Sequence, residues 1–457
     1  MATVVTSRKA CTVNPLKMSQ PIGGALAFMG IRGCMPLLHG SQGCTSFGLV
    51  LFVRHFRESI PLQTTAMSEV ATVLGGFDNV EAAIVNIAKR TKPEIIGICS
   101  TGVTEVKGDD VDAFIRVIRA NHPELAHIGL VYVSTPDFKG AFQDGWSRAV
   151  VQLVEQLVEP VPEGHRMLRN PRQINVLPGS HLTPGDLEEL REIIEAFGLE
   201  PLFLPDLSGS LDGHIPEDFT PTTLGGISLA QIARLGSSAH TIAVGEQMRA
   251  AAVAMEVRTG VPFTLFDRLT GLAPNDDLIA LLASLGGQSV PAKYRRQRSQ
   301  LVDAMLDGHF HFGGKKIAIG AEPDLLWSMS AFLTEMGSQI TAAVTTTASP
   351  LLAQMETGEV LIGDLEDLEC RSAGCDLLIT HSHGRQAAQR LNIPLYRLGF
   401  PMFDRLGAGH RLSVGYRGTR DLIFEIGNVF VAESHEVTPD TWRRSEETAV
   451  ESAVPLS

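Results

Sequence analysis

The feature that most constrains the fold is a local pattern repeated along the chain. A continuous apolar run leads into a loop of small residues, and an amphipathic helix follows. Residues 94–100 (EIIGICS) and 127–133 (HIGLVYV) are two such runs. Apolar runs without strict alternation are typical of parallel strands covered by helices on both faces. The pattern therefore predicts an α/β protein with mainly parallel sheets.

The pattern restarts twice, after a Pro-rich stretch at 159–171 and after a basic segment at 293–298. A chain of 457 residues is long enough for two to four domains. We expect three Rossmann-like, doubly wound domains around a central cleft. Their predicted bounds are 1–165, 166–308 and 309–457, the last with a C-terminal helix and a frayed tail from Arg444. Further strands are predicted at 173–177, 202–204, 240–244, 261–265, 315–321, 340–344, 360–362, 375–380 and 394–398.

Two helices have clear start or stop signals. Thr183 can cap a helix that has Pro184 at its first position. A second helix is expected over residues 323–336, where Gly337 would end it.

Charge and hydropathy exclude several classes of protein. The net charge is −13, whereas a nucleic-acid-binding or membrane-surface protein is normally basic. No apolar run approaches the roughly 18 residues that span a bilayer, and residues 1–13 are too polar for a signal peptide. Six scattered cysteines without a CxxC pair fit a reducing compartment. We therefore expect a cytoplasmic protein that binds neither nucleic acid nor membrane.

The usual nucleotide, hydrolase and zinc-protease motifs are missing. The sequence contains no GxxxxGK[ST], GxGxxG, GxSxG or HExxH. The most informative segment instead surrounds Cys44, in the run HGSQGC at 39–44. Gly43 lets the backbone approach a bulky ligand and presents an amide N–H to sulfur, and a helix N-terminus stabilises a thiolate. On these residues alone, a cysteine in such a sequence is more often a small buried residue than a ligand of an iron–sulfur cluster.

Several long motifs resemble the β-type chains of the nitrogenase component-1 family. They are HGSQGC, RHFRE at 54–58, TGVTEV at 101–106 with GDD at 108–110, and TPDF at 135–138. Three others resemble specifically the scaffold subunits of that family, on which the iron–molybdenum cofactor is matured. They are PDLSGSLDGH at 205–214, YRRQRSQLVDAM at 294–305 and GDLEDLE at 363–369. The resemblance covers about residues 10–435.

The chain departs from the catalytic β subunit at the cluster positions. Of three family cysteines only Cys44 remains, because Ser19 and Gly102 stand at the other two positions. Asp137 replaces a serine that can also ligate the catalytic cluster. A 4Fe–4S cluster commonly takes four thiolates, so the resemblance implies that three come from another chain. We predict Cys44 as the metal ligand, with Gly43, Ser19 and Gly102 also at the cofactor site.

The resemblance also implies the partners and the role of the chain. It would pair with NifE, the α-like subunit, in an α₂β₂ heterotetramer with a shared 4Fe–4S cluster. NifE would supply three cysteines and hold most of the iron–molybdenum cofactor precursor, while NifH and NifB would bind transiently. The chain itself shows no catalytic constellation. The alternatives are a catalytic nitrogenase β subunit, a protochlorophyllide reductase-type subunit, and an iron-free solute-binding protein or glycosyltransferase of similar architecture.

Other candidate residues have simpler interpretations. Asp137 is expected to cap a turn rather than to ligate iron, and His381 and His383 to bond loop groups rather than a metal. His39 is either a hydrogen-bond donor near the cluster or a structural histidine. Cys34 and Cys99 are expected to lie in the core, and Arg54, Arg57 and Glu58 to form ion pairs at an interface. The basic segment 293–298 is expected to face water or an acidic partner. The turn at 74–76 is expected to dock NifH.

Overall fold

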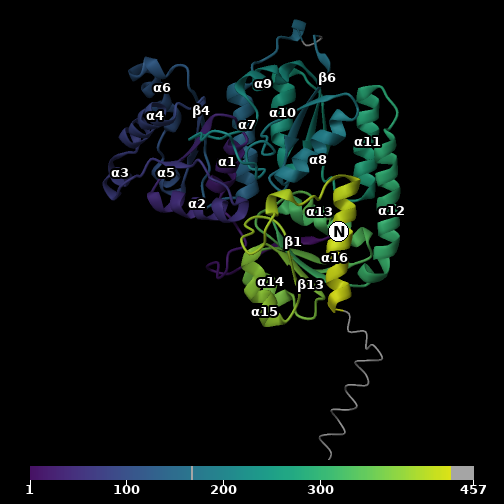
Figure 1. Ribbon diagram of the computed structural model, residues 1–457. Helices are drawn as coiled ribbons and strands as arrows, with labels where there is room; N and C mark the ends of the chain where they lie inside the picture. Colours follow the sequence, from purple (N-terminus) through teal and green to yellow (C-terminus); the bar gives the residue numbers. More distant parts are fainter. Residues whose placement is uncertain (166–167, 434–457) are drawn as a thin grey trace, which may run out of the picture.

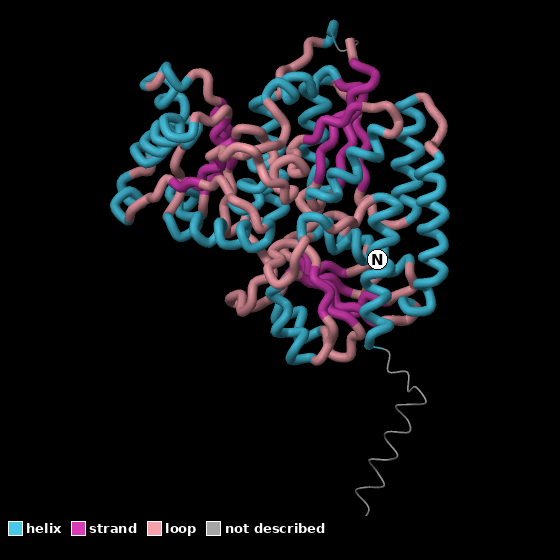
Figure 2. Tube along the Cα trace, viewed as in Figure 1, coloured by secondary structure: helices cyan, strands magenta, loops and turns pink. Residues whose placement is uncertain are grey.

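The computed structural model describes residues 1–165 and 168–433. Figures 1 and 2 show parallel sheets with helices on both faces, grouped into three lobes. Within the described residues there are three sheets, and every strand pair in them is parallel. The predicted α/β fold with mainly parallel sheets is confirmed.

The first sheet has the strand order β3-β2-β4-β5. Its strands are β2 (Cys34–His39), β3 (Gln63–Thr64), β4 (Ile95–Ser100) and β5 (Gly129–Val133). The helices of this lobe are α1 (Gln20–Met29), α2 (Gln42–Phe56), α3 (Glu69–Leu74), α4 (Phe77–Thr91), α5 (Gly102–Lys107), α6 (Val111–Asn121) and α7 (Phe142–Leu157), with the 3₁₀ turns η1 (Pro123–Leu125) and η2 (Glu163–His165).

The strand β4 shows why its apolar run has no polar alternation. Ile95 and Cys99 pack with α1 and α7, whereas Ile96 and Ile98 pack with α4 and α6. Both faces of the strand are therefore buried, as expected for a helix-covered parallel sheet. On one face α1 and α7 approach closely, since a Cβ on Gly23 would lie 1.9 Å from the Phe142 carbonyl oxygen.

The second sheet has the order β7-β6-β8-β9. Its strands are β6 (Asn170–Pro178), β7 (Glu200–Phe203), β8 (Ser238–Val244) and β9 (Phe263–Phe266). The helices are α8 (Pro184–Glu195), α9 (Leu229–Arg234), α10 (Arg249–Thr259), α11 (Leu272–Gly286) and α12 (Ala292–Phe312), with η3 (Leu235–Ser237) and η4 (Glu246–Met248). The Thr183 hydroxyl accepts a hydrogen bond from the Asp186 N–H at 3.0 Å, so α8 begins where the sequence predicts.

The third sheet has the order β1-β12-β11-β10-β13-β14. Its strands are β1 (Thr3–Thr6), β10 (Lys316–Ala321), β11 (Gln339–Thr345), β12 (Glu359–Ile362), β13 (Leu377–Thr380) and β14 (Leu395–Arg397). The helices are α13 (Pro323–Glu335), α14 (Leu365–Arg371), α15 (Arg385–Leu391) and α16 (Gly415–Glu433), with η5 (Leu352–Gln354), η6 (Ser382–Gly384) and η7 (Ala408–His410). The predicted frayed tail from Arg444 lies outside the described residues.

The N-terminal segment differs from the sequence prediction. We expected residues 1–165 to belong to the first unit, but β1 pairs with β12 at the edge of the third sheet. Lys9 then binds Asp364 at 2.9 Å and Asp367 at 3.0 Å. The first residues of the chain therefore fasten the first lobe to the third.

Candidate functional site

Cys44 lies in the first turn of α2, directly after the loop that follows β2. Ser41 is the N-cap residue, and its hydroxyl oxygen lies 3.7 Å from the Cys44 Sγ. The thiol side chain is half-buried, while Gly43 beside it is exposed. The first N–H groups of a helix have no intrahelical acceptor, and Ser41 does not cap them. This turn therefore presents a half-buried sulfur beside backbone N–H groups that have no intrahelical acceptor.

Gly102 and Asp137 lie at the same edge of the first sheet. Cys44, Gly102 and Asp137 follow the carboxyl ends of β2, β4 and β5, which are adjacent parallel strands. A Cβ on Gly102 would lie 2.0 Å from the Asp137 Oδ1. The Asp137 carboxylate therefore occupies the space that a side chain at position 102 would fill.

Ser19 is the N-cap residue of α1, but its hydroxyl makes no capping hydrogen bond. Together with Asp137 it lines an open pocket of about 430 Å³, against the N-terminal segment and the loop before α14. The structure thus brings Ser19, Gly102 and Asp137 together. The turn-capping role expected for Asp137 stays a prediction.

His39 lies beneath the Cys44 loop and is fully buried. Its Nδ1 is 3.0 Å from the Thr65 hydroxyl and its Nε2 is 3.5 Å from the Asp109 carboxylate. Burial lowers the pKa of His39, and Asp109 opposes that shift. Gly76 packs against this ring, since a Cβ there would lie 2.6 Å from the His39 Cε1. These contacts make His39 a structural link between the Cys44 loop and the turn at 74–76.

The other cysteines do not form a second site. Cys34 and Cys99 are fully buried in the core, as predicted, and burial raises the pKa of both thiols. Cys11 and Cys370 are exposed, and Cys375 Sγ lies 3.2 Å from the Thr341 hydroxyl. Over residues 1–165 and 168–433, no three His, Cys, Asp or Glu side chains are grouped so that they could hold a metal ion.

The histidine pair after β13 has a structural role, as the sequence favours. His381 Nε2 donates to the Leu16 carbonyl at 3.0 Å, and its Nδ1 accepts the His383 N–H at 3.3 Å. The two rings meet edge to face at 5.3 Å. This arrangement fixes the loop after β13 to the N-terminal segment.

The structure also shows what the basic side chains at 293–298 and at 54–57 contact. In α12, Lys293 binds Glu192 and Arg298 binds Asp276, so these side chains pair within the chain. In α2, the Arg54 guanidinium lies 4.2 Å from the Phe403 ring centre, and Arg57 donates to the Phe403 carbonyl. Both arginines thus contact Phe403 rather than a carboxylate of the described chain.

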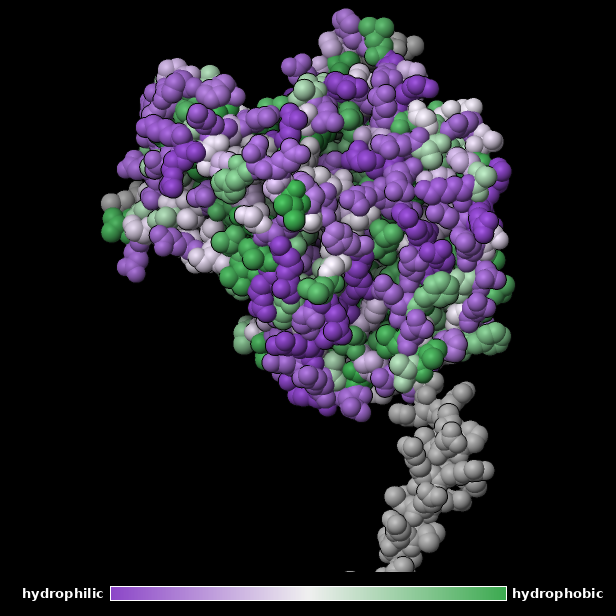
Figure 3. Space-filling model, in the orientation of Figure 1, coloured by the Kyte–Doolittle hydropathy of each residue, from purple (hydrophilic) through white to green (hydrophobic). Residues whose placement is uncertain are grey.

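Two exposed apolar surfaces flank the candidate site. The α2 stripe consists of Phe47, Val50 and Val53, and Figure 3 shows hydrophobic side chains gathered over α2. The valine patch consists of Val70 and Val73 on α3 and of Val103 and Val106 on α5. The predicted docking turn at 74–76 adjoins this patch, and Lys107 joins the two helices by donating to the Ala71 carbonyl at 3.3 Å. Large exposed apolar patches commonly mark interaction sites, so both surfaces are candidate binding faces.

Some site features could not be recognised in the sequence. The carboxylate of Asp137 over Gly102 depends on the start of α5 and on the loop after β5, which lie 35 residues apart, and neither segment carries a local signal for the contact. His55 and His181 line a central cavity. His55 lies in the motif RHFRE, but that motif does not point to a cavity, and no motif contains His181. For the histidines of this cavity, the sequence gives only a positional signal. His181 and His381 each follow a buried strand, where ligand sites of α/β proteins form.

The comparisons with known proteins agree with this architecture. The family model "Nitrogenase component 1 type Oxidoreductase" matches residues 19–431. The chain is 65% identical to the nitrogenase iron-molybdenum cofactor biosynthesis protein NifN of Bradyrhizobium diazoefficiens, over 97% of this chain and 95% of that one. It is 53% identical to NifN of Nostoc sp., over 94% and 96% of the two chains.

Solved structures show the same fold. A chain of nitrogenase Cp1 at pH 6.5 superposes with a TM-score of 0.88 and 32% identity, covering 95% of this chain and 97% of that one. A chain of nitrogenase Cp1 at pH 5 superposes with a TM-score of 0.69 at 15% identity, which supports the fold alone. The protein therefore belongs to the nitrogenase component 1 type oxidoreductase family, in which it closely resembles the NifN proteins.

Proposed function

We propose that this chain is a scaffold subunit for maturation of the nitrogenase iron–molybdenum cofactor. It pairs with NifE in an α₂β₂ heterotetramer and gives one thiolate, from Cys44, to a 4Fe–4S cluster between the two subunits. The observation that carries this proposal is the half-buried Cys44 thiol after β2, at the sheet edge where Gly102 follows β4, while Ser19 and Gly102 carry no sulfur. The exposed Cys11 lines the open pocket of Ser19 and Asp137, but it belongs to the N-terminal segment that pairs with the third sheet.

This chain offers one of the four ligands that a 4Fe–4S cluster needs. A 4Fe–4S cluster takes four ligands, one per iron, and such a cluster supplies one-electron transfer when bound. Cys44 would ligate one iron, and the N–H groups at Gly43 would face sulfur. Ser19 and Gly102 would form the wall, where the Asp137 carboxylate already fills the space over Gly102. The other three thiolates would come from NifE.

The α2 stripe supports a partner subunit at this place. Phe47 is 59% exposed and Val50 51% exposed, one and two turns after Cys44. A subunit that covered this face would bury the apolar side chains and could reach the thiol with its own cysteines. The thiol and the stripe thus point to one interface.

The remaining partners follow from the same assignment. NifH would dock on the valine patch next to the turn at 74–76, and NifB would deliver the precursor. NifE would hold most of that precursor, because no group of three potential metal ligands occurs in the described part of this chain. We assign the complex to the cytoplasm, since few and scattered cysteines suit a reducing compartment. No helix of the described residues could span a bilayer.

A catalytic oxidoreductase subunit is the second candidate, and the 32% identity to a nitrogenase Cp1 chain favours it. Ser19 and Gly102 oppose it, because a larger cluster needs more thiolates than Cys44 supplies. Iron analysis separates the two functions: about four irons in the shared cluster of each NifE-containing pair support the scaffold, and about eight support catalysis.

The decisive variant is Cys44→Ser in the complex co-expressed with NifE. We expect the iron and acid-labile sulfide of the shared cluster to fall by at least half, or its electron paramagnetic resonance signal to change, because one iron loses its thiolate. Cys370→Ser is the matched control, since Cys370 is exposed on α14, in the third lobe. The control should leave both readouts unchanged.

Two outcomes would contradict the assignment. An unaltered cluster spectrum and iron content in Cys44→Ser would remove Cys44 from the ligand set. A stable 4Fe–4S cluster in the chain expressed without NifE would show that the missing thiolates are not supplied by a partner.

A further inference from the structure

A partly enclosed cavity lies where the three lobes meet. It has a volume of about 80 Å³, and most of its lining is apolar. The loops that follow β6, β10, β13 and β14 border it, together with α1, α2 and the start of α7. Ligands of open α/β proteins bind beyond the carboxyl ends of parallel strands, which is the position of this cavity.

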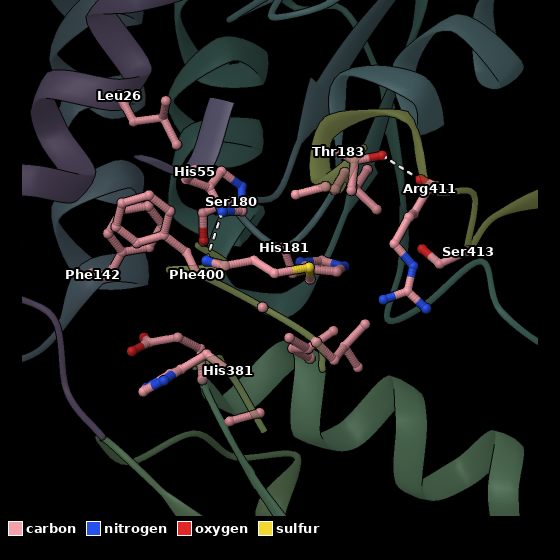
Figure 4. A pocket seen from close by; sticks show the side chains of 18 of the residues that line it. Leu26, His55, Phe142, Ser180, His181, Thr183, His381, Phe400, Arg411 and Ser413 are labelled. Atoms are coloured by element: carbon pink, nitrogen blue, oxygen red, sulfur yellow. Dashed lines mark hydrogen bonds between the residues drawn. The ribbon is translucent and has the colours of Figure 1, made fainter. Parts of the chain in front are cut away.

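Each lobe contributes one histidine to the lining. His55 comes from α2, His181 from the loop after β6, and His381 from the loop after β13. Figure 4 shows the three rings around the cavity with the rings of Phe142 and Phe400.

Two of these histidines have a donor without a protein partner. His55 Nδ1 accepts the Met402 N–H at 2.9 Å, so its proton is on Nε2. His181 Nδ1 lies 3.4 Å from the Gln247 side-chain nitrogen, which donates to it and again leaves the proton on Nε2. Neither Nε2–H has a hydrogen-bond acceptor among the described residues. His381 differs, because both of its ring nitrogens are bonded.

The cavity wall carries no uncompensated charge near neutral pH. Burial lowers the pKa of His55 to about 3 and those of His181 and His381 to about 4. Burial raises the pKa of Glu322 to about 8, so that this carboxyl stays protonated. The remaining charge, on Arg411, is paired with Glu425. An ionic ligand would therefore find no counter-charge here.

We propose that this cavity is a binding site for a small uncharged organic molecule that carries a hydrogen-bond acceptor, such as a carbonyl oxygen, for His55 and His181. The size limits the ligand to about three or four non-hydrogen atoms, because benzene, with six, occupies a cavity of about 150 Å³ and this one has about 80 Å³. No cysteine lines the cavity, so it does not suit an iron–sulfur cluster. The site is thus separate from the thiol at Cys44.

The test uses the full chain and two probes of equal shape. The probe acetone carries a carbonyl oxygen, and 2-methylpropene has a methylene group in its place. We expect acetone to shift the imidazole Nε2–H nuclear magnetic resonance signals of His55 and His181 in a saturable manner. The affinity ratio of the two probes, ketone over alkene, should fall about tenfold in His181→Phe, which is about 1.4 kcal/mol for the lost hydrogen bond.

Two further variants complete the experiment. His240→Phe is the matched control, because His240 is a half-buried histidine on β8 outside this cavity, and the ratio should not change there. Ala321→Leu fills the cavity and should abolish saturable binding of both probes. The proposal is overturned by the absence of saturable binding to the unmodified chain, by an unchanged ratio in His181→Phe, or by binding that survives Ala321→Leu.

Discussion

Gly102 shows how one absent side chain determines the surroundings of its neighbour. A Cβ at this position would meet the Asp137 Oδ1 at 2.0 Å and the Asp137 Cγ at 2.9 Å. The two residues therefore form a complementary pair, in which the carboxylate of one fills the space left by the other. The sequence shows both departures from the family pattern, but only the folded chain shows that they are coupled.

The variant Gly102→Ala tests this pairing. We expect a loss of about 1 kcal/mol in the free energy of unfolding, because the Asp137 carboxylate must move. Asp137→Ala in the same chain should recover most of that loss, giving a coupling energy of at least about 0.5 kcal/mol. Denaturant unfolding of the four proteins measures it.

Gly43→Ala is the matched control for that experiment. Gly43 also lies in the first turn of a helix, but a Cβ there would meet only the Ser41 hydroxyl, at 3.9 Å. Its stability should stay equal or rise by up to about 1 kcal/mol, since alanine loses less backbone entropy. Equal costs at positions 43 and 102 would argue against the pairing.

Among the elements, the N-termini of α7 and α13 hold two lobes together. The Glu322 carboxyl accepts the Gln143 N–H at 3.1 Å, and the Gln143 side-chain oxygen accepts the Asp324 N–H at 3.2 Å. Asp324 in turn accepts two hydrogen bonds from Gln247, both at 3.0 Å. These reciprocal bonds join the first and third lobes to the second.

The buried carboxyl of Glu322, which takes part in these hydrogen bonds, should make the stability of the fold depend on pH. Burial raises the pKa of Glu322 to about 8 from an ordinary value of 4.5. The unfolded chain therefore releases this proton at a lower pH than the folded chain does. This group should lower stability as pH rises from about 4.5 to about 8, by at most about 1.4 kcal/mol per pH unit.

Glu322→Gln measures this contribution. The variant should gain stability relative to the unmodified chain as pH rises from 5 to 8, because the amide has no proton to lose. Thermal unfolding at several pH values follows the difference. A constant difference across that range would show that Glu322 titrates normally.

At the scale of the whole molecule, strand β1 links the N-terminal segment before α1 to the edge of the third sheet. Four residues of β1 pair with β12, and Lys9 binds the start of α14. Removal of residues 2–9 should therefore expose the edge of β12 to water. We expect faster amide hydrogen exchange in β12, with little change in β8 of the second sheet. Equal protection of β12 in both proteins would show that β1 adds nothing to this edge.

The local parts of the fold could be predicted from the sequence, and the non-local parts could not. The predicted strands correspond to β4 through β14, with ends shifted by at most three residues. Thr183 begins α8, and Gly337 follows α13 with a φ of +90°. In contrast, β1, β2 and β3 were not predicted, and β2 contains Pro36, a residue that is unusual in a central strand. It is tolerated there because β3 pairs only with Leu37 and Leu38.

The sequence by itself determined the parallel α/β architecture, the single thiol at Cys44 and the missing sulfur at positions 19 and 102, since these follow from short-range patterns and residue identity. Only the tertiary structure decided that β1 joins the third sheet, that Asp137 covers Gly102 and that three histidines share one cavity. Each of these contacts joins segments distant in the sequence. Chain folding, rather than local pattern, brings such segments together, because the energy of the contact is gained only when both sides are buried in place.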